Sequence, residues 1–167
     1  MRVLIIICLF MLVMGAPSPS AHVVGFSNSK DIPTVAYCDL IRNPDTYSGK
    51  LVRISAVYRF GFEWQEFYCL DCFEMETRTW VKFDDEESSC TRRVSKRLTK
   101  AWAGTFSMTV VGEFQSSRGR YGHENGYRYQ FMVKCVEAQK RLLKSGFFPA
   151  QVPSGTLKDA CKAAPPQ

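Results

Sequence analysis

Residues 51–59 read Leu-Val-Arg-Ile-Ser-Ala-Val-Tyr-Arg, and this stretch decides the class of fold. The core-type positions are every second residue: Val52, Ile54, Ala56 and Tyr58. The alternate positions carry Arg53, Ser55, Val57 and Arg59. Successive side chains of a β-strand point to opposite faces, so this period predicts a strand with one face in a core and the other toward solvent.

Four further stretches predict strands by the same period or by their content of β-branched and aromatic residues. They are Phe67 to Leu70, Thr79 to Phe83, Phe106 to Phe114, and Tyr127 to Cys135. The polar, glycine-rich stretch from Ser116 to Gly126 is expected to be the hairpin loop between the last two strands.

A short helix is expected before the first strand, capped by Thr34 and ended by Asn43-Pro44. Its apolar face consists of Ala36, Tyr37, Leu40 and Ile41. Residues 45–49 are expected to form a turn between this helix and the strand.

A second helix is expected after the acidic run that begins at Asp84. Its apolar side carries Val94, Leu98, Ala101 and Trp102, and its basic side carries Arg92, Arg93, Lys96, Arg97 and Lys100. Acids at a helix start and bases toward its end complement the helix dipole, so we interpret this segment as a solvated structural helix. Binding of nucleic acid through the basic side is the alternative.

The resulting chain order is strand, strand, strand, helix, strand, strand, which is the order of the OB-fold, a five-stranded Greek-key barrel. We therefore expect an all-β protein with one or two helices, built as an OB-fold-like barrel of order β-β-β-α-β-β after a short N-terminal helix. The expected divisions are a signal peptide at 1–16, a flexible lead-in at 17–32, the barrel domain at 33–144 and a loose C-terminal tail at 145–167.

The first residues predict export. Met1-Arg2 precede an apolar run from Val3 to Met14 that is too short to span a bilayer, and small residues follow it. This pattern is typical of a secretory signal peptide, with cleavage expected between about residues 15 and 21. We expect an exported protein, periplasmic or secreted, that has no membrane contact after cleavage.

Removal of the leader takes Cys8 from the seven cysteines and leaves six: Cys38, Cys69, Cys72, Cys90, Cys135 and Cys161. An even number outside the cytosol indicates disulfides. Six cysteines allow 15 connectivities, and the sequence leaves them open. A bridge from Cys72 to Cys90, for example, closes a loop of roughly twenty residues.

The spacing Cys69-Leu70-Asp71-Cys72 also occurs in thiol-exchange and zinc sites. Exchange centres place the pair at the start of a helix, and zinc needs a second ligand pair at short spacing. The stretch here is predicted as strand or tight turn, and the other cysteines are widely separated, so structural disulfides are expected.

Two segments carry a resemblance to known proteins. Residues 38–54 contain Asn43-Pro44-x-x-Tyr47-x-Gly49-Lys50 directly before a strand, and residues 121–128 read Tyr-Gly-His-Glu-Asn-Gly-Tyr-Arg. The stretch from Tyr37 to Glu137, about 100 of the 167 residues, resembles small exported bacterial proteins of uncharacterised function with an OB-fold-like domain. The resemblance implies the fold and no activity, because OB-like barrels have many unrelated functions.

Composition excludes several classes of protein. The chain has 22 Lys and Arg against 16 Asp and Glu, a formal charge of +6, and 46% hydrophobic residues. This is too apolar for a disordered or fibrous chain. Without a heptad series or an apolar stretch of membrane-spanning length, coiled coils and multi-span membrane proteins are excluded as well.

OB-like barrels bind ligands at strands two and three and at the loops that join strands one to two and four to five. Here the first loop, residues 60–66, is rich in aromatic and acidic residues, and the second, residues 118–128, is rich in arginine and tyrosine. The candidate ligand-binding residues are Trp64, Arg118, Arg120, Tyr121, His123 and Arg128. Rings that stack beside arginines that hold anionic groups predict a polyanionic or carbohydrate ligand.

No catalytic constellation is identified. His22 lies near the cleavage site, and His123 is interpreted as a surface histidine in a glycine-rich loop. Carboxylates for a glycosidase pair are present at Glu63, Glu66, Asp71, Glu74 and Glu76, but nothing in their spacing places two at the required separation. We expect no enzyme activity, no metal and no cofactor.

We therefore interpret the chain as an exported binding module for a polyanionic or carbohydrate ligand. One alternative is a structural or protein-interaction role in the cell envelope, and another is thiol-disulfide exchange through Cys69 and Cys72. The expected partners are a polyanion, an oligosaccharide or an envelope protein, and nucleic acid is not expected in the export compartment.

Overall fold

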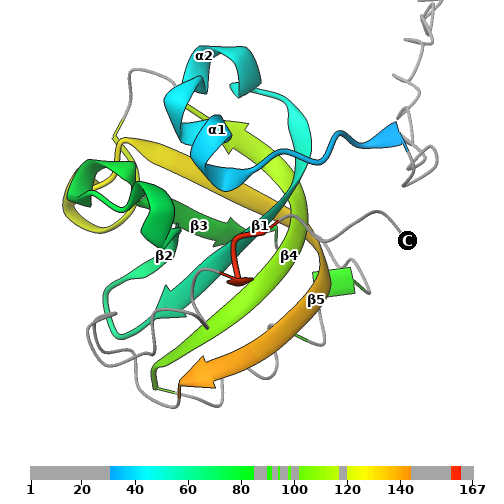
Figure 1. Ribbon diagram of the computed structural model, residues 1–167. Helices are drawn as coiled ribbons and strands as arrows, with labels where there is room; N and C mark the ends of the chain where they lie inside the picture. Colours follow the sequence, from blue (N-terminus) through cyan, green and yellow to red (C-terminus); the bar gives the residue numbers. More distant parts are fainter. Residues whose placement is uncertain are drawn as a thin grey trace, which may run out of the picture.

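The computed structural model describes residues 31–84, 90, 91, 94, 98, 102–116, 120–143 and 159–162. Within these residues the secondary structure is mostly β, with two short helices, five strands and the further helical residues Cys90, Thr91, Val94 and Leu98 (Figure 1). The helices are α1 (Tyr37–Arg42) and α2 (Pro44–Tyr47), and the strands are β1 (Leu51–Phe60), β2 (Gln65–Tyr68), β3 (Thr79–Phe83), β4 (Gly104–Gln115) and β5 (Tyr129–Leu143). Short 3-10 turns are η2 (Leu70–Cys72), η3 (Met75–Thr77) and η4 (His123–Asn125). The expected mostly-β class with one or two helices is confirmed.

The five strands pair in a closed ring, in the order β1-β2-β3-β5-β4. Every pair is antiparallel except β3 with β5, which is parallel. The long strand β1 pairs along its whole length with β4, and its last four residues also pair with β2. In Figure 1, α1 and α2 lie together at one end of this ring.

The inner face of β1 forms the core as predicted. It buries the four residues of the apolar period in one hydrophobic cluster: Val52, Ile54, Ala56 and Tyr58. The outer face differs from the prediction of a solvent-facing side. It is buried at three positions: Ser55, Val57 and Arg59. Ala160 packs against Val57 and Tyr68 outside the ring, so the second half of β1 is covered on both faces.

The first helix begins later than the sequence predicts. The N-cap of α1 is Ala36, and Thr34 does not cap it. Thr34 instead forms a parallel bridge with Arg53 of β1, and the backbone N–H of Val35 donates to the carbonyl of Arg53 at 2.9 Å. This pairing keeps the chain extended up to Ala36. The expected turn at 45–49 is in part helical, since Pro44 starts α2.

Of the residues named for the predicted second helix and its flanks, the structure describes Cys90, Thr91, Val94, Leu98 and Trp102. The first four are helical, and Val94 and Leu98 are buried in the core cluster. Trp102 was expected on the same apolar side, but it lies past the helical residues and is 85% exposed. The acidic start at 85–89 and the basic side lie outside the described residues.

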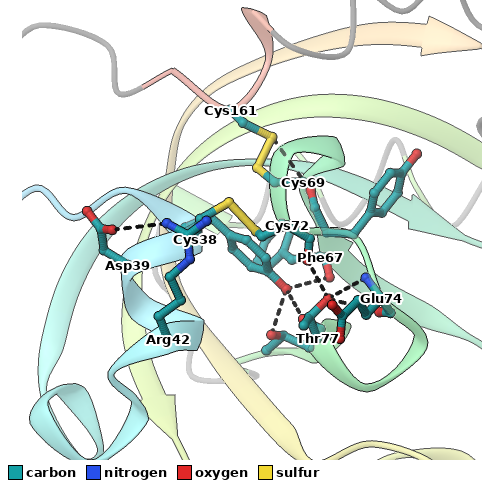
Figure 2. Close-up of a disulfide and its surroundings, with 12 residues drawn as sticks. Cys38, Asp39, Arg42, Phe67, Cys69, Cys72, Glu74, Thr77 and Cys161 are labelled. Carbon is teal, nitrogen blue, oxygen red and sulfur yellow. Dashed lines mark hydrogen bonds and ion pairs between the residues drawn. A yellow bond between two sulfur atoms is a disulfide. The ribbon is translucent and has the colours of Figure 1, made fainter.

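The six cysteines from Cys38 to Cys161 form three disulfides, which confirms the expectation of a disulfide framework. The pairs are Cys38–Cys72, Cys69–Cys161 and Cys90–Cys135. Figure 2 shows the first two pairs side by side at the turn η2. The bridge from Cys72 to Cys90 considered above is not formed, because Cys72 pairs with Cys38 and Cys90 with Cys135. Cys69 and Cys72 belong to different bridges. A Cys-x-x-Cys exchange centre requires its two cysteines to pair with each other, and these two do not.

Of the predicted tail, the structure describes residues 159–162, which the disulfide of Cys161 ties to the end of β2. The rest of the tail, the predicted signal peptide and most of the lead-in lie outside the described residues. In the part of the chain that the structure describes, no helix is long and apolar enough to cross a membrane.

Candidate functional site

Two loops come together beside β2 and β3. The first loop, residues 61–64, joins β1 to β2, and the second loop, residues 116–128, joins β4 to β5 and is described at 116 and from 120 onward. Nε2 of His123 lies 3.6 Å from Oε2 of Glu63, so the loops are in contact. The loops whose residues form the candidate set therefore lie at one surface of the ring.

The first loop is a tight turn closed by its own tryptophan. The backbone N–H of Gly61 donates to the carbonyl of Trp64 at 2.8 Å. The indole ring lies so close to Gly61 that a Cβ at this position would be 2.5 Å from a ring carbon. The guanidinium of Arg59 lies 5.2 Å from the centroid of the same ring. Trp64 is thus held half-buried against β1.

The second loop is closed at its base by an antiparallel bridge between Tyr121 and Tyr127. Two backbone hydrogen bonds of 2.9 and 3.1 Å join them. Arg120 directly precedes Tyr121 and Arg128 directly follows Tyr127, so the bridge brings the backbones of the two arginines near each other just outside it. Both are exposed, and among the described residues neither forms an ion pair with an acid. Like charges close together are unfavourable unless an anion lies between them.

Gly122 fits the second loop against β3. Its φ of +73° and ψ of −165° belong to a region that only glycine adopts readily. A Cβ on Gly122 would also lie 2.5 Å from ring carbons of Trp80 on β3. The rings of Trp80 and Tyr127 pack with their centroids 5.2 Å apart. The backbone at Gly122 therefore lies directly against the ring of Trp80.

Beneath the loops, Glu66 of β2 is fully buried and paired with three donors. Its Oε1 accepts a hydrogen bond from Arg59 of β1. Its Oε2 accepts from Arg78 at 2.9 Å and from the hydroxyl of Tyr127 at 2.6 Å. A buried carboxylate is tolerated when it is paired and hydrogen-bonded in this way. Two guanidinium groups against one carboxylate leave the cluster with a net positive charge.

Aromatic rings complete the surroundings of both arginines. Arg59 lies between the rings of Trp64 and Tyr68, with its guanidinium carbon 5.3 Å from the Tyr68 centroid. Arg78 lies 5.3 Å from the centroid of Tyr127. Guanidinium groups over ring faces gain from cation–π attraction, most of all where water is excluded. We call Arg59, Glu66, Arg78 and Tyr127 the Glu66 cluster, which connects β1, β2, the residue between η3 and β3, and the second loop.

The tyrosines of this region are strongly perturbed. Burial raises the pKa of Tyr127 far above its ordinary value, and the hydrogen bond to the Glu66 carboxylate raises it further. Burial also raises the pKa of Tyr68 to about 12, against the opposing effect of Arg59. Neither phenol ionises near neutral pH, so Tyr127 serves here as a hydrogen-bond donor.

The predicted site residues fall into two groups. Trp64 and Tyr121 are half-buried, whereas Arg120, His123 and Arg128 are exposed. Arg118 lies outside the described residues. The guanidinium of Arg128 lies 5.5 Å from the ring centroid of Tyr129.

Sequence analysis missed the Glu66 cluster. Arg59 was placed on the solvent side of its strand, and Glu66 was considered only as a possible member of a glycosidase pair. In the structure the loop has only four residues, and this length puts Arg59 and Glu66 directly opposite each other. The loop predicted from the sequence, residues 60–66, was longer, and both ends of this pairing lay within it or next to it. Arg78 and Tyr127 come from distant parts of the chain, and no local pattern predicts their contact with Glu66.

The surface formed by the two loops presents exposed arginines and half-buried aromatic rings. Beneath it, both carboxylate oxygens of Glu66 already accept hydrogen bonds. Glu66 is saturated by its donors and is not positioned as a general acid or base. Among the described residues, no three His, Cys, Asp or Glu side chains form a group that can hold a metal ion. Compared with known proteins, the chain matches no family model, no curated protein sequence and no solved structure.

Proposed function

We propose that this protein is an exported binding module and that the surface formed by the two loops binds a polyanionic or carbohydrate ligand. The observation that carries the proposal is the placement of Arg120 and Arg128 near each other, just outside the Tyr121–Tyr127 bridge. Two neighbouring arginines without acidic partners among the described residues favour an anionic group between them. The half-buried rings of Trp64 and Trp80 add faces on which a sugar ring can stack.

The proposed fold type is an OB-fold-like barrel. Its support is the ring order β1-β2-β3-β5-β4, with β3 and β5 parallel and helical residues between β3 and β4. In this fold type the loops that join strands one to two and four to five contribute to ligand binding. The two loops of the candidate surface occupy these places in the chain.

Export is supported by the three disulfides, because such bonds persist in oxidising compartments. In these oxidising compartments, exported proteins are exposed to acidic polysaccharides and other anionic polymers. The formal charge of +6 favours association with them.

The test is binding of the purified, oxidised protein to a heparin-like oligosaccharide and to a neutral one, at about 50 and 200 mM salt. The Arg120→Ala/Arg128→Ala variant is expected to bind the heparin-like probe at least about tenfold more weakly, because charge-assisted hydrogen bonds are lost. Binding by the unaltered protein is expected to weaken with salt.

Arg42→Ala is the matched control, since Arg42 is an exposed arginine on α1 and lies on a different element. Equal binding by the double variant and the unaltered protein would reject the proposed surface. Loss of binding on replacing Arg92, Arg93 and Arg97 instead would assign the ligand to the predicted basic helix.

A further inference from the structure

Two aromatic side chains project from the surface next to each other. Phe62 is 82% exposed and Trp102 is 85% exposed, whereas most other aromatic residues described are at least half-buried. Their rings stack with centroids 6.4 Å apart and planes 17° apart. Exposed apolar groups that gather at one place on a soluble protein mark a contact site.

The backbone brings the two rings together. The last pair of the β1–β4 ladder is Phe60 with Gly104. Phe62 lies two residues after Phe60, and Trp102 lies two residues before Gly104, so both stand just beyond the same end of the ring. The hydrogen bond from Gly61 to Trp64 fixes the turn that carries Phe62. The aromatic pair is therefore a preformed feature of this end.

The end of β5 lies beside the same ladder end and adds basic groups. Arg141 is opposite Phe106 in the β4–β5 pairing, and its guanidinium lies 5.7 Å from the Phe106 ring centroid. Lys140, the residue before it, is exposed. Leu143, opposite Thr105, adds a half-buried apolar side chain. This end thus combines an aromatic tip with a basic rim.

The small residues around the aromatic pair decide what kind of partner fits. Gly61, Ala103 and Gly104 offer no side-chain hydrogen bonds, which a sugar ring would need for its hydroxyl groups. The neighbouring acid, Glu63, lies toward His123 of the second loop. Aromatic side chains are enriched at the headgroup level of membranes, and basic side chains beside them are attracted to anionic lipids.

We propose that the end of the ring that carries Phe62 and Trp102 binds an anionic lipid surface, with both rings inserted at the headgroup level. The site adjoins the proposed ligand surface, since Phe62 lies in the first loop, but it does not include Arg120 or Arg128. The proposal differs from the sequence-based expectation of no membrane contact after cleavage, which came from the absence of a membrane-spanning apolar stretch.

The test uses the oxidised protein with vesicles of phosphatidylglycerol mixed with phosphatidylcholine, and with vesicles of phosphatidylcholine alone. Co-sedimentation is expected with the mixed vesicles and is expected to weaken with salt. Tryptophan emission is expected to shift to the blue on binding, and this shift is expected to be absent from Trp102→Ala. Phe62→Ala/Trp102→Ala is expected to weaken vesicle binding at least about tenfold. The variant lacks the two exposed rings whose transfer from water to the membrane would stabilise the bound state.

Met75→Ala is the matched control, since Met75 is an exposed apolar residue on η3. It should bind vesicles like the unaltered protein, and Arg120→Ala/Arg128→Ala should keep the emission shift. Absence of vesicle binding, or equal binding by the Phe62→Ala/Trp102→Ala variant, would overturn the proposal. Self-association that the same variant abolishes, without vesicle binding, would overturn it in favour of a second copy of the chain.

Discussion

At the scale of single residues, the candidate surface depends on Glu66, whose charge is buried between two guanidinium groups. Glu66→Gln keeps the size of the side chain and removes its charge, which leaves Arg59 buried beside a neutral amide. Breaking a buried ion pair from one side costs about 3–5 kcal/mol. We expect Glu66→Gln to lower the free energy of unfolding, measured by urea denaturation, by an amount within this range.

Glu124→Gln is the control for this substitution, because Glu124 is an exposed acid on the second loop. Its effect is expected to stay within about 0.5 kcal/mol. If Glu66→Gln cost no more than the control, the Glu66 cluster would not be holding the loop to the ring.

Buried tyrosines give a second residue-scale prediction. Burial raises the pKa of Tyr37, Tyr58, Tyr68 and Tyr127 above the ordinary value of 10.0, to about 12 for Tyr68. Above pH 10 the unfolded chain loses these protons while the folded chain keeps them, so stability is complete below about pH 10 and falls as pH rises toward 12 and beyond. Phenolate absorbance of these tyrosines should therefore appear together with loss of circular dichroism. A smooth titration of all tyrosines near pH 10 with the fold intact would contradict this.

At the scale of elements, the second loop depends on Gly122. An alanine there would take up a backbone conformation that suits only glycine, and its Cβ would collide with the ring of Trp80. Gly122→Ala is expected to lower the free energy of unfolding by about 1–3 kcal/mol and to weaken binding of the heparin-like probe.

Gly126→Ala serves as the comparison within the same loop. Gly126 has an ordinary φ of −76°, and a Cβ there would meet only the carbonyl of His123 at 3.3 Å. Its effect on stability is expected to be smaller by at least about 1 kcal/mol. Equal effects of the two substitutions would mean that the contact of Gly122 with Trp80 does not fix the loop.

The elements also show where local pattern suffices for prediction. The predicted strand at 79–83 coincides with β3, because its alternation is uninterrupted. The last strand was predicted to end at Cys135, yet β5 continues to Leu143. The β4–β5 pairing shifts register between Thr109 and Val110 and again between Val111 and Gly112. Such irregularities change which side chains face the core. The regular alternation of the sequence therefore stops before the strand itself ends.

At the scale of the whole molecule, the class of fold follows from the period of β1, whereas the candidate surface does not. The two loops can be located from the sequence because they join predicted strands. The cover over the outer face of β1 comes from Ala160, whose position is set by a disulfide with a sequence separation of 92. Of 15 connectivities, the sequence favours none, and so the burial of Val57 and Arg59 was not predictable.

That disulfide provides the last prediction. Cys69→Ser/Cys161→Ser releases residues 159–162 and is expected to lower the free energy of unfolding by about 2–5 kcal/mol, with faster amide exchange at Val57 and Tyr68. Cys38→Ser/Cys72→Ser is the control, because it opens a shorter loop, with a separation of 34, and leaves the cover in place. The chain-entropy relation makes its cost about 1 kcal/mol smaller. Unchanged exchange at Val57 in the first variant would show that β1 is protected without the C-terminal segment.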